Sequence, residues 1–127
     1  MTAGNEQLME LRNKHVPGGV ALLSPAFIAK AQGAIMTDVE GRELIDFAGG
    51  IGVNNVGHSH PKVVKAIQEQ AEKFIHTCFH VAPYQGYIEL AQRLNELAPG
   101  NSPKQTMLAN SGAEAVENAI KIARYVT

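Results

Sequence analysis

The sequence contains one cysteine, almost no excess charge and no long hydrophobic run, and each shortage excludes a class of protein. Cys78 has no second cysteine to pair with, which excludes an internal disulfide and favours a reducing compartment. The net charge is -1, and lysines and arginines are scattered singly, so neither nucleic acid nor an acidic membrane surface is an expected partner. No stretch resembles a membrane-spanning helix or a secretory leader. We therefore expect a cytoplasmic protein.

The first half of the chain has the pattern of a short helix followed by a small antiparallel sheet. Leu8 and Leu11 would lie on the inner face of the helix, which Pro17 and the glycines after it would end. Apolar stretches at residues 27–29, 34–37 and 43–47 are typical of short strands. Glycines between these stretches suit tight turns. The product would be a three-stranded antiparallel meander.

Two amphipathic helices are predicted after a glycine-rich loop at residues 49–52. Ser59 or His60 would cap the first helix, and Pro61 would take its first position. Apolar residues recur on one face of this helix up to Phe74. The second helix would end near Leu97, before a Pro-Gly pair. Each apolar face would need a surface to cover it.

The last residues of the chain predict a buried strand that leads into a helix. Residues 106–109 form a short apolar stretch. Ser111 and Glu114 fit a capping box, in which the hydroxyl accepts from the N–H of Glu114 and the carboxylate accepts from the N–H of Ser111. No stop signal follows Val126, and a single parallel strand has no sheet to join. We therefore expect the partner strands to lie in another part of a longer protein or in a second polypeptide.

Four segments, in this order, resemble the N-terminal region of class III aminotransferases, which depend on pyridoxal 5'-phosphate (PLP). They are residues 38–51 (DVEGRELIDFAGGI), 57–64 (GHSHPKVV), 76–79 (HTCF) and 110–117 (NSGAEAVE). The resemblance extends from about Leu8 to Thr127. Among the members of this family, the DVEGR, FAGGI and HTCF stretches are most similar to those of bacterial 4-aminobutyrate aminotransferases.

The resemblance implies an α/β fold, namely the N-terminal part of a PLP fold-type I subunit of the aspartate aminotransferase type. An N-terminal helix and a small antiparallel meander would precede helices and the first strand–helix unit of the large domain. Residues 1–57 would form the N-terminal arm and part of the small domain. Residues 58–127 would begin the large PLP-binding domain, which would be truncated at Thr127.

The resemblance also implies which residues form the site. Ser111, Gly112 and Ala113 would hold the phosphate of PLP, and unpaired N–H groups at a helix start independently favour an anion. The alternative is that Ser111 and Glu114 only cap a buried helix. Ile51 would contact the carbon chain of the substrate. Its alternative role is that of a loop residue packed on the small sheet.

The implied reaction transfers the amino group of an omega-amino acid, such as 4-aminobutyrate, to a 2-oxo acid such as 2-oxoglutarate. The implied assembly is a homodimer or a higher homo-oligomer. By the family pattern, the lysine that bonds PLP and the other catalytic groups lie beyond Thr127. We therefore expect no catalytic residue within these 127 residues, which would be inactive alone.

Three other interpretations use parts of the same sequence. Side chains that zinc accepts occur at His58, His60, His76, Cys78 and His80. They lack the paired close spacings of zinc sites, so we expect no metal. A free-standing module could instead bind phosphate at the start of the last helix. A non-catalytic chain could associate with a larger subunit.

Overall fold

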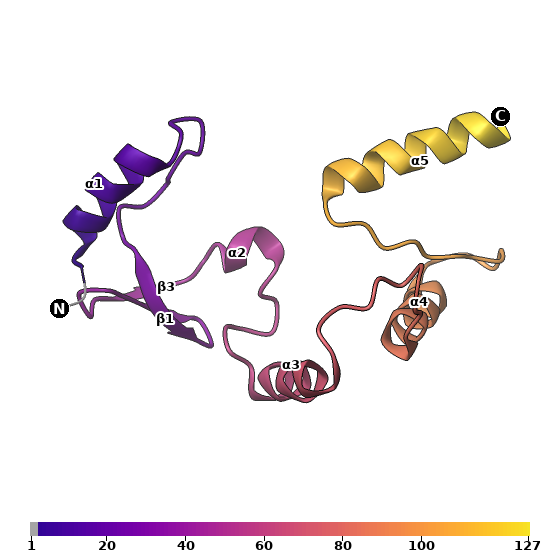
Figure 1. Cartoon of the computed structure of the whole chain (residues 1–127), viewed down its shortest axis with the longest axis horizontal. Helices are drawn as coiled ribbons and strands as arrows, with labels where there is room; N and C mark the ends of the chain where they lie inside the picture. The colour runs from indigo at the N-terminus through magenta and orange to yellow at the C-terminus, as the bar shows by residue number, and fades with distance from the viewer. Residues whose placement is uncertain (1–2) are drawn as a thin grey trace. The chain divides into compact units, whose positions relative to one another are not determined.

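The computed structural model describes residues 3–127 (Figure 1). The chain divides into two compact units, Met1–Ile75 and His76–Thr127. Eight elements follow one another along the chain. They are α1 (Asn5–His15), β1 (Ile28–Gln32), β2 (Ile35–Asp38), β3 (Glu43–Ile45), α2 (Gly49–Gly52), α3 (Pro61–Lys73), α4 (Gln85–Leu97) and α5 (Gly112–Val126). The predicted domain boundary between residues 57 and 58 differs from the division into compact units and stays a prediction.

The first unit is built on the antiparallel sheet that the sequence predicts. The strand order is β1-β2-β3, so each strand pairs with its neighbour in sequence. Ile35 lies opposite Ile45, and Ile28 lies opposite Asp38 across a register shift in β1. Gly33 and Gly41 form the turns with φ of 58° and 86°, a region that suits glycine. The meander prediction is confirmed.

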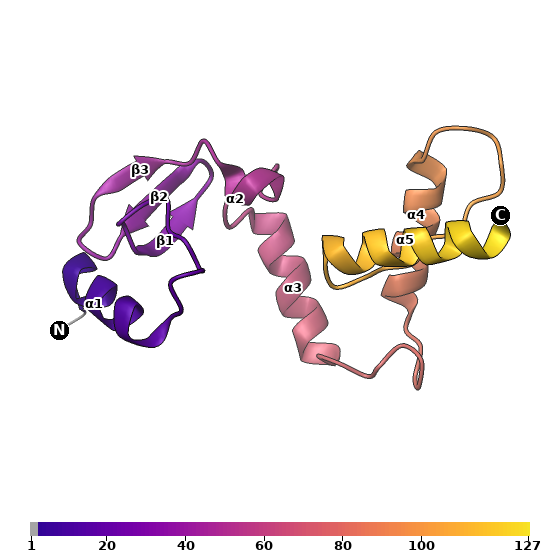
Figure 2. The same cartoon turned by 90° about the horizontal axis from the view of Figure 1, so that it is seen from above.

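A buried polar cluster ties α1 to this sheet, and Figure 2 shows the helix beside the strands. Asn5 and Asp38 are the only buried residues in the part of the chain that the structure describes, at 8% and 2% exposure. Asn5 donates from its amide to Asp38 at 3.0 Å, and its amide oxygen accepts from the N–H of Phe27 at 2.7 Å. Its own backbone N–H donates to Glu40 at 2.9 Å. These bonds fix the start of α1 against β1 and β2.

The Asp38 carboxylate is saturated with hydrogen bonds. Its Oδ1 accepts from the N–H groups of Glu40 and Arg42, both at 2.9 Å. Its Oδ2 accepts from the Arg42 guanidinium at 2.7 Å and from Asn5. Burial raises the pKa of Asp38, but hydrogen bonds from Arg42, Asn5 and Glu40 outweigh burial and lower it to about 2. The carboxylate therefore favours its charged form in the folded chain.

Helix α3 begins as the sequence predicts. The His60 ring accepts from the N–H of Lys62 at 3.3 Å, and Pro61 takes the first helical position, where a missing N–H is tolerated. His60, not Ser59, is therefore the capping residue. The helix ends at Lys73, just before the extended Phe74.

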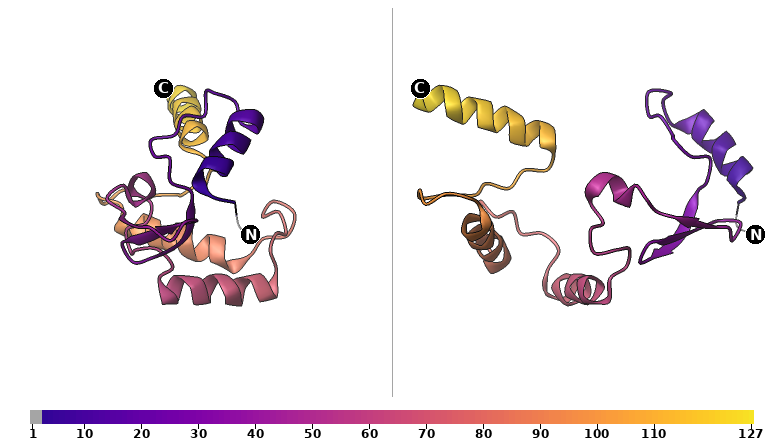
Figure 3. Two further views of the ribbon diagram at one scale, coloured as in Figure 1. Left: turned by 90° about the vertical axis from the view of Figure 1, so that its left-hand side faces the viewer. Right: turned by 180° about the vertical axis from the view of Figure 1, so that it is seen from behind.

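The second unit contains α4 and α5, joined by the long segment 98–111 (Figure 3). The strand predicted at residues 106–109 is not formed: this stretch has no regular secondary structure. A strand needs a partner for its backbone groups, and the described residues offer it none. The N–H of Leu108 instead donates to the Tyr87 hydroxyl at 2.9 Å, and the Thr106 hydroxyl donates to Asn95 at 2.7 Å.

The apolar faces of the helices are uncovered. Within residues 3–127, no apolar side chain is buried. Ile67 of α3 is 63% exposed, Leu97 of α4 is 64% exposed and Val116 of α5 is 60% exposed. Amphipathic helices are stable when their apolar stripe packs against another layer. These faces therefore have the character of surfaces that another part of a protein covers.

No described helix is both long enough and apolar enough to span a bilayer.

Candidate functional site

The start of α5 carries the residues predicted to bind phosphate. Ser111 has an extended backbone, and its Oγ accepts from the N–H of Glu114 at 3.2 Å, as the capping box predicts. The reciprocal bond differs from the prediction. The Glu114 carboxylate accepts from the N–H of Asn110 at 2.8 Å, one residue before Ser111. The glutamate side chain is long enough to reach either N–H group.

Two backbone N–H groups remain available at this helix start. Those of Gly112 and Ala113 have no hydrogen-bond partner among residues 3–127, because the helix supplies acceptors only from its second turn onward. Ser111, Gly112 and Ala113 are exposed. No neighbouring atom lies within 4 Å of the position that a Cβ would take at Gly112. An anion can therefore approach both N–H groups closely.

The donors at this helix start suit a phosphate group. A helix N-terminus stabilises a nearby anion by about 0.3–1 kcal/mol, and by more when the site is partly buried. The Ser111 hydroxyl already accepts one hydrogen bond and keeps its proton to donate. Two N–H groups and one hydroxyl are donors of the kind that a PLP phosphate requires, so these residues fit the cofactor that the sequence implies.

Ile51, the predicted substrate contact, lies in a left-handed turn. The glycine-rich loop forms α2, and Gly49, Gly50, Ile51 and Gly52 have φ values of 52°, 61°, 58° and 78°. Left-handed backbone costs glycine little, but a β-branched residue there is strained by about 1–3 kcal/mol. The Ile51 side chain is 90% exposed. The interpretation of Ile51 as a residue packed on the sheet is therefore wrong for this chain.

A carboxylate and an imidazole hold the base of this turn, and the sequence interpretation missed them. Asp46 Oδ1 accepts from the N–H groups of Ala48 and Gly49 at 2.9 and 2.8 Å, and its Oδ2 lies 2.6 Å from His58 Nε2. The His58 hydrogen bond, aided by that of Gly49, lowers the pKa of Asp46. An aspartate just before a glycine-rich turn is a known turn signal and could have indicated the first half of this arrangement.

Two of the histidines considered as metal ligands have other partners. His58 bonds to Asp46, and His60 caps α3. Across the described range, residues 3–127, no group of three or more histidine, cysteine, aspartate or glutamate side chains is arranged to hold a metal ion.

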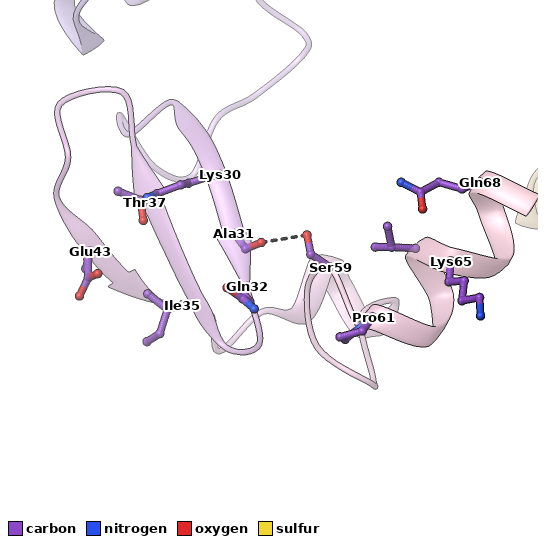
Figure 4. A pocket seen from close by; sticks show the side chains of 11 residues that line it. Lys30, Ala31, Gln32, Ile35, Thr37, Glu43, Ser59, Pro61, Lys65 and Gln68 are labelled. Atoms are coloured by element: carbon purple, nitrogen blue, oxygen red, sulfur yellow. Dashed lines mark hydrogen bonds between the residues drawn. The ribbon is translucent and has the colours of Figure 1, made fainter.

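A groove of about 900 Å³ lies between the sheet and the start of α3 in the first unit (Figure 4). Its lining is mixed, with Lys30, Thr37, Glu43 and Lys65 around it. The Ser59 hydroxyl donates to the carbonyl of Ala31 at 3.0 Å at its edge. None of the residues predicted for phosphate or substrate lines this groove. Ile51 belongs to the first unit and Ser111, Gly112 and Ala113 to the second.

The comparisons with known proteins agree with the sequence motifs. The family described as "Aminotransferase class-III" matches residues 19–127. The chain is 54% identical over 127 residues to 5-aminovalerate aminotransferase DavT of Pseudomonas putida, covering 100% of this chain and 30% of the relative. It is 50% identical over 123 residues to 4-aminobutyrate aminotransferase GabT of Escherichia coli, covering 97% of this chain and 29% of the relative.

A solved structure resembles this chain in its backbone fold. Taurine:2-oxoglutarate aminotransferase from Bifidobacterium kashiwanohense, in complex with PLP and glutamate, matches with a TM-score of 0.84 and 29% identity. The match covers 99% of this chain and 28% of that one. The chain thus has the α/β fold of the corresponding part of these enzymes, and it spans about 30% of the length of the curated relatives it matches.

Proposed function

The chain belongs to the class III aminotransferases, and on this premise we propose that it serves as the N-terminal portion of a PLP-dependent omega-aminotransferase. The amino donor would be an omega-amino acid such as 4-aminobutyrate, and the acceptor a 2-oxo acid such as 2-oxoglutarate. Support comes from relatives named for 4-aminobutyrate and 5-aminovalerate, which are both omega-amino acids. They match almost all of this chain at about half identity.

The start of α5 is the observation that carries the proposal. Gly112 and Ala113 would donate their free N–H groups to the phosphate of PLP, and Ser111 would add its hydroxyl. When bound, PLP supplies an electron sink that permits amino-group transfer. The contribution of this chain would be to anchor the phosphate and so to orient the ring. Ile51 would offer an apolar contact to the carbon chain of the substrate.

The remaining features of the enzyme are proposals of the same kind. The lysine that bonds PLP would lie outside these 127 residues, so the chain would need the rest of the protein for activity. The protein would act in the cytoplasm as a homodimer or a higher homo-oligomer. Residues 1–57 would belong to the N-terminal arm and small domain, and residues 58–127 to the large domain.

A second candidate function follows from the uncovered helices. Because no apolar side chain in residues 3–127 is buried, the chain could be a non-catalytic piece that binds phosphate or associates with a larger subunit. This candidate predicts that the full-length protein that contains the chain transfers no amino group. The enzyme predicts transfer that depends on PLP.

Two substitutions at Ser111 separate helix capping from phosphate binding. Aspartate caps helices as well as serine does, so Ser111→Asp should preserve α5 while it places a negative charge beside the phosphate. We expect PLP affinity of the full-length protein to fall about 100-fold, since like charges a few ångströms apart near a surface repel by several kcal/mol. Ser111→Ala removes the cap and one donor, and should cost helix stability of about 1 kcal/mol.

The measurement is PLP binding by absorbance, together with transfer from 4-aminobutyrate to 2-oxoglutarate. Ser102→Asp is the matched control, because Ser102 is exposed in the same unit and outside α5. The control should bind PLP as the parent protein does. Undiminished PLP binding by Ser111→Asp would contradict the role of this helix start, and no transfer by the parent protein would contradict the enzyme.

A further inference from the structure

The strained turn Gly49–Gly52 needs hydrogen bonds from outside the turn to keep its backbone conformation. Ile51 sits at φ 58° and ψ 57°, where a β-branched residue is rarely stable, and its side chain is 90% exposed. Packing of the side chain therefore does not compensate for the strain. Within the turn, the N–H groups of Val53 and Asn54 both donate to the carbonyl of Gly49, at 2.9 and 2.8 Å. Strain of this kind persists only where the surroundings determine the backbone.

Asp46 provides the hold at the entrance of the turn. Its Oδ1 accepts from two consecutive N–H groups, those of Ala48 and Gly49, and its side chain is only 6% exposed. The backbone N–H of Asp46 donates to the carbonyl of Ala34 at 2.8 Å, which anchors the residue to the sheet. Ala48 and Gly49, at the entrance of the turn, are thus tied to the hairpin between β1 and β2.

His58 anchors the segment that follows the turn. Its backbone exchanges two hydrogen bonds with Gly33, at 2.9 and 2.8 Å, in the hairpin between β1 and β2. Its Nε2 lies 2.6 Å from Asp46 Oδ2, and since a carboxylate only accepts, the imidazole donates. Asn54, inside the exit segment, has its amide nitrogen 3.4 Å from His58 Nδ1. The side-chain bond from Asp46 to His58 therefore closes the loop at its base.

We infer that Asp46 and His58 are positioning residues, which hold the Gly49–Gly52 turn so that Ile51 meets the carbon chain of an omega-amino acid and distinguishes chain lengths. The assignment of the ligand rests on the proposed function. The positioning itself rests on the hydrogen bonds at the two ends of the turn. Neither residue touches the substrate in this role.

The substitutions are designed to keep the fold. His58→Phe retains a ring of similar size and removes the donor, whereas His58→Gln retains a donor. Asp38→Asn is the matched control, because Asp38, like Asp46, accepts from two backbone N–H groups of a turn and from side-chain N–H donors. Asp38 lies outside the 46–58 loop, so the loss of its carboxylate should weaken the sheet without altering the turn.

The first measurement is hydrogen exchange at the amides of residues 49–54 in the full-length protein. Loss of one hydrogen bond of this kind should speed their exchange about tenfold in His58→Phe. The exchange of β1 and β2 should stay unchanged, and His58→Gln should behave more nearly as the parent. This arm needs no activity. Equal exchange at residues 49–54 in His58→Phe and the parent would overturn the inference.

The second measurement is the ratio of kcat/KM for 4-aminobutyrate to that for 5-aminovalerate, which differ by one methylene. Ile51→Ala and His58→Phe should each change this ratio about fivefold in the same direction, within the range that one methylene permits. The double variant should change it no more than Ile51→Ala alone. A merely structural role for His58 would lower both kcat/KM values equally and leave the ratio unchanged, as expected for Asp38→Asn.

The two arms separate this inference from the proposed function. If the parent protein transfers neither amino group, the proposed function fails and the exchange of residues 49–54 still decides the positioning. If exchange accelerates while the ratio stays constant, the assignment of Ile51 to the carbon chain is overturned.

Discussion

The two compact units differ in the hydrogen bonds that stabilise each of them. In Met1–Ile75, side chains far apart in sequence meet at carboxylates whose side chains are hardly exposed: Asn5 bonds to Asp38, and His58 bonds to Asp46. In His76–Thr127, most hydrogen bonds are local, and the distant ones join α4 to the segment before α5 without a charged group, as between Tyr87 and Leu108. Polar clusters can fix a tertiary arrangement without an apolar core. Amphipathic helices without such clusters depend on a surface that covers them.

The largest predicted effect tests the tight backbone packing of the first unit. Gly57 has φ of 84°, and a side chain there would begin 3.1 Å from the Cα of Gly33. Gly57→Ala should therefore lower the free energy of unfolding by about 3 kcal/mol, from left-handed strain and overpacking together. Urea unfolding of the full-length protein measures this loss. An unchanged midpoint would mean that the His58–Gly33 bridge does not constrain the loop.

Acid should weaken the first unit through Asp38. Its pKa falls to about 2 on folding, so the unfolded chain binds more protons as the pH drops. The stabilisation is complete above the ordinary aspartate pKa and is lost as the pH falls through about 2. Asp38→Asn removes this dependence, so the difference in stability between parent and variant should be constant above about pH 5 and shrink towards pH 2. Thermal unfolding across this range measures the difference, and a constant difference down to pH 2 would contradict the prediction.

A smaller effect is expected from the hydroxyl that ties the second unit together. Tyr87→Phe leaves the N–H of Leu108 without its acceptor and should cost about 1 kcal/mol. The ring also stacks on Phe79 with centroids 4.2 Å apart, and phenylalanine preserves that contact. Tyr125→Phe is the control, because Tyr125 is 90% exposed. Urea unfolding should detect a loss for Tyr87→Phe only, and equal losses in both variants would remove the special role of Tyr87.

The smallest effect has the opposite sign and completes the contrast. Gly86 lies in the first turn of α4, and nothing lies within 4 Å of where its side chain would begin. Gly86→Ala should therefore raise the free energy of unfolding by about 0.5 kcal/mol, because alanine loses less backbone entropy in a helix. Urea unfolding of Gly86→Ala and Gly57→Ala, measured side by side, compares their free energies of unfolding. Destabilisation by Gly86→Ala would show that the second unit is packed more closely there than its exposure indicates.

The local parts of the fold could be predicted because their signals span a few residues. The glycines at 33 and 41 form the turns of the meander, His60 and Pro61 begin α3, and Ser111 caps α5. The strand at residues 106–109 was wrong because a strand depends on a partner, which composition alone does not supply. The roles of Ser111, Gly112, Ala113 and Ile51 toward ligands stay predictions.

The Asp46–His58 pair could not be found by the same reasoning. The two residues are twelve positions apart, and both sit among residues that already have local explanations as turn formers and helix caps. The same holds for Asn5 and Asp38, which are 33 positions apart. A hydrogen bond between distant residues depends on how the intervening chain folds.

The sequence by itself determined where most helices and strands begin and end, and it determined membership of the class III aminotransferases through motifs at residues 38–51, 57–64, 76–79 and 110–117. Only the tertiary structure decided that Asp38 and Asp46 become the anchors of the first unit and that Ile51 stands on a left-handed turn. The physical reason is range. Propensities and caps act within one turn of chain, whereas burial and distant hydrogen bonds depend on which segments fold against one another.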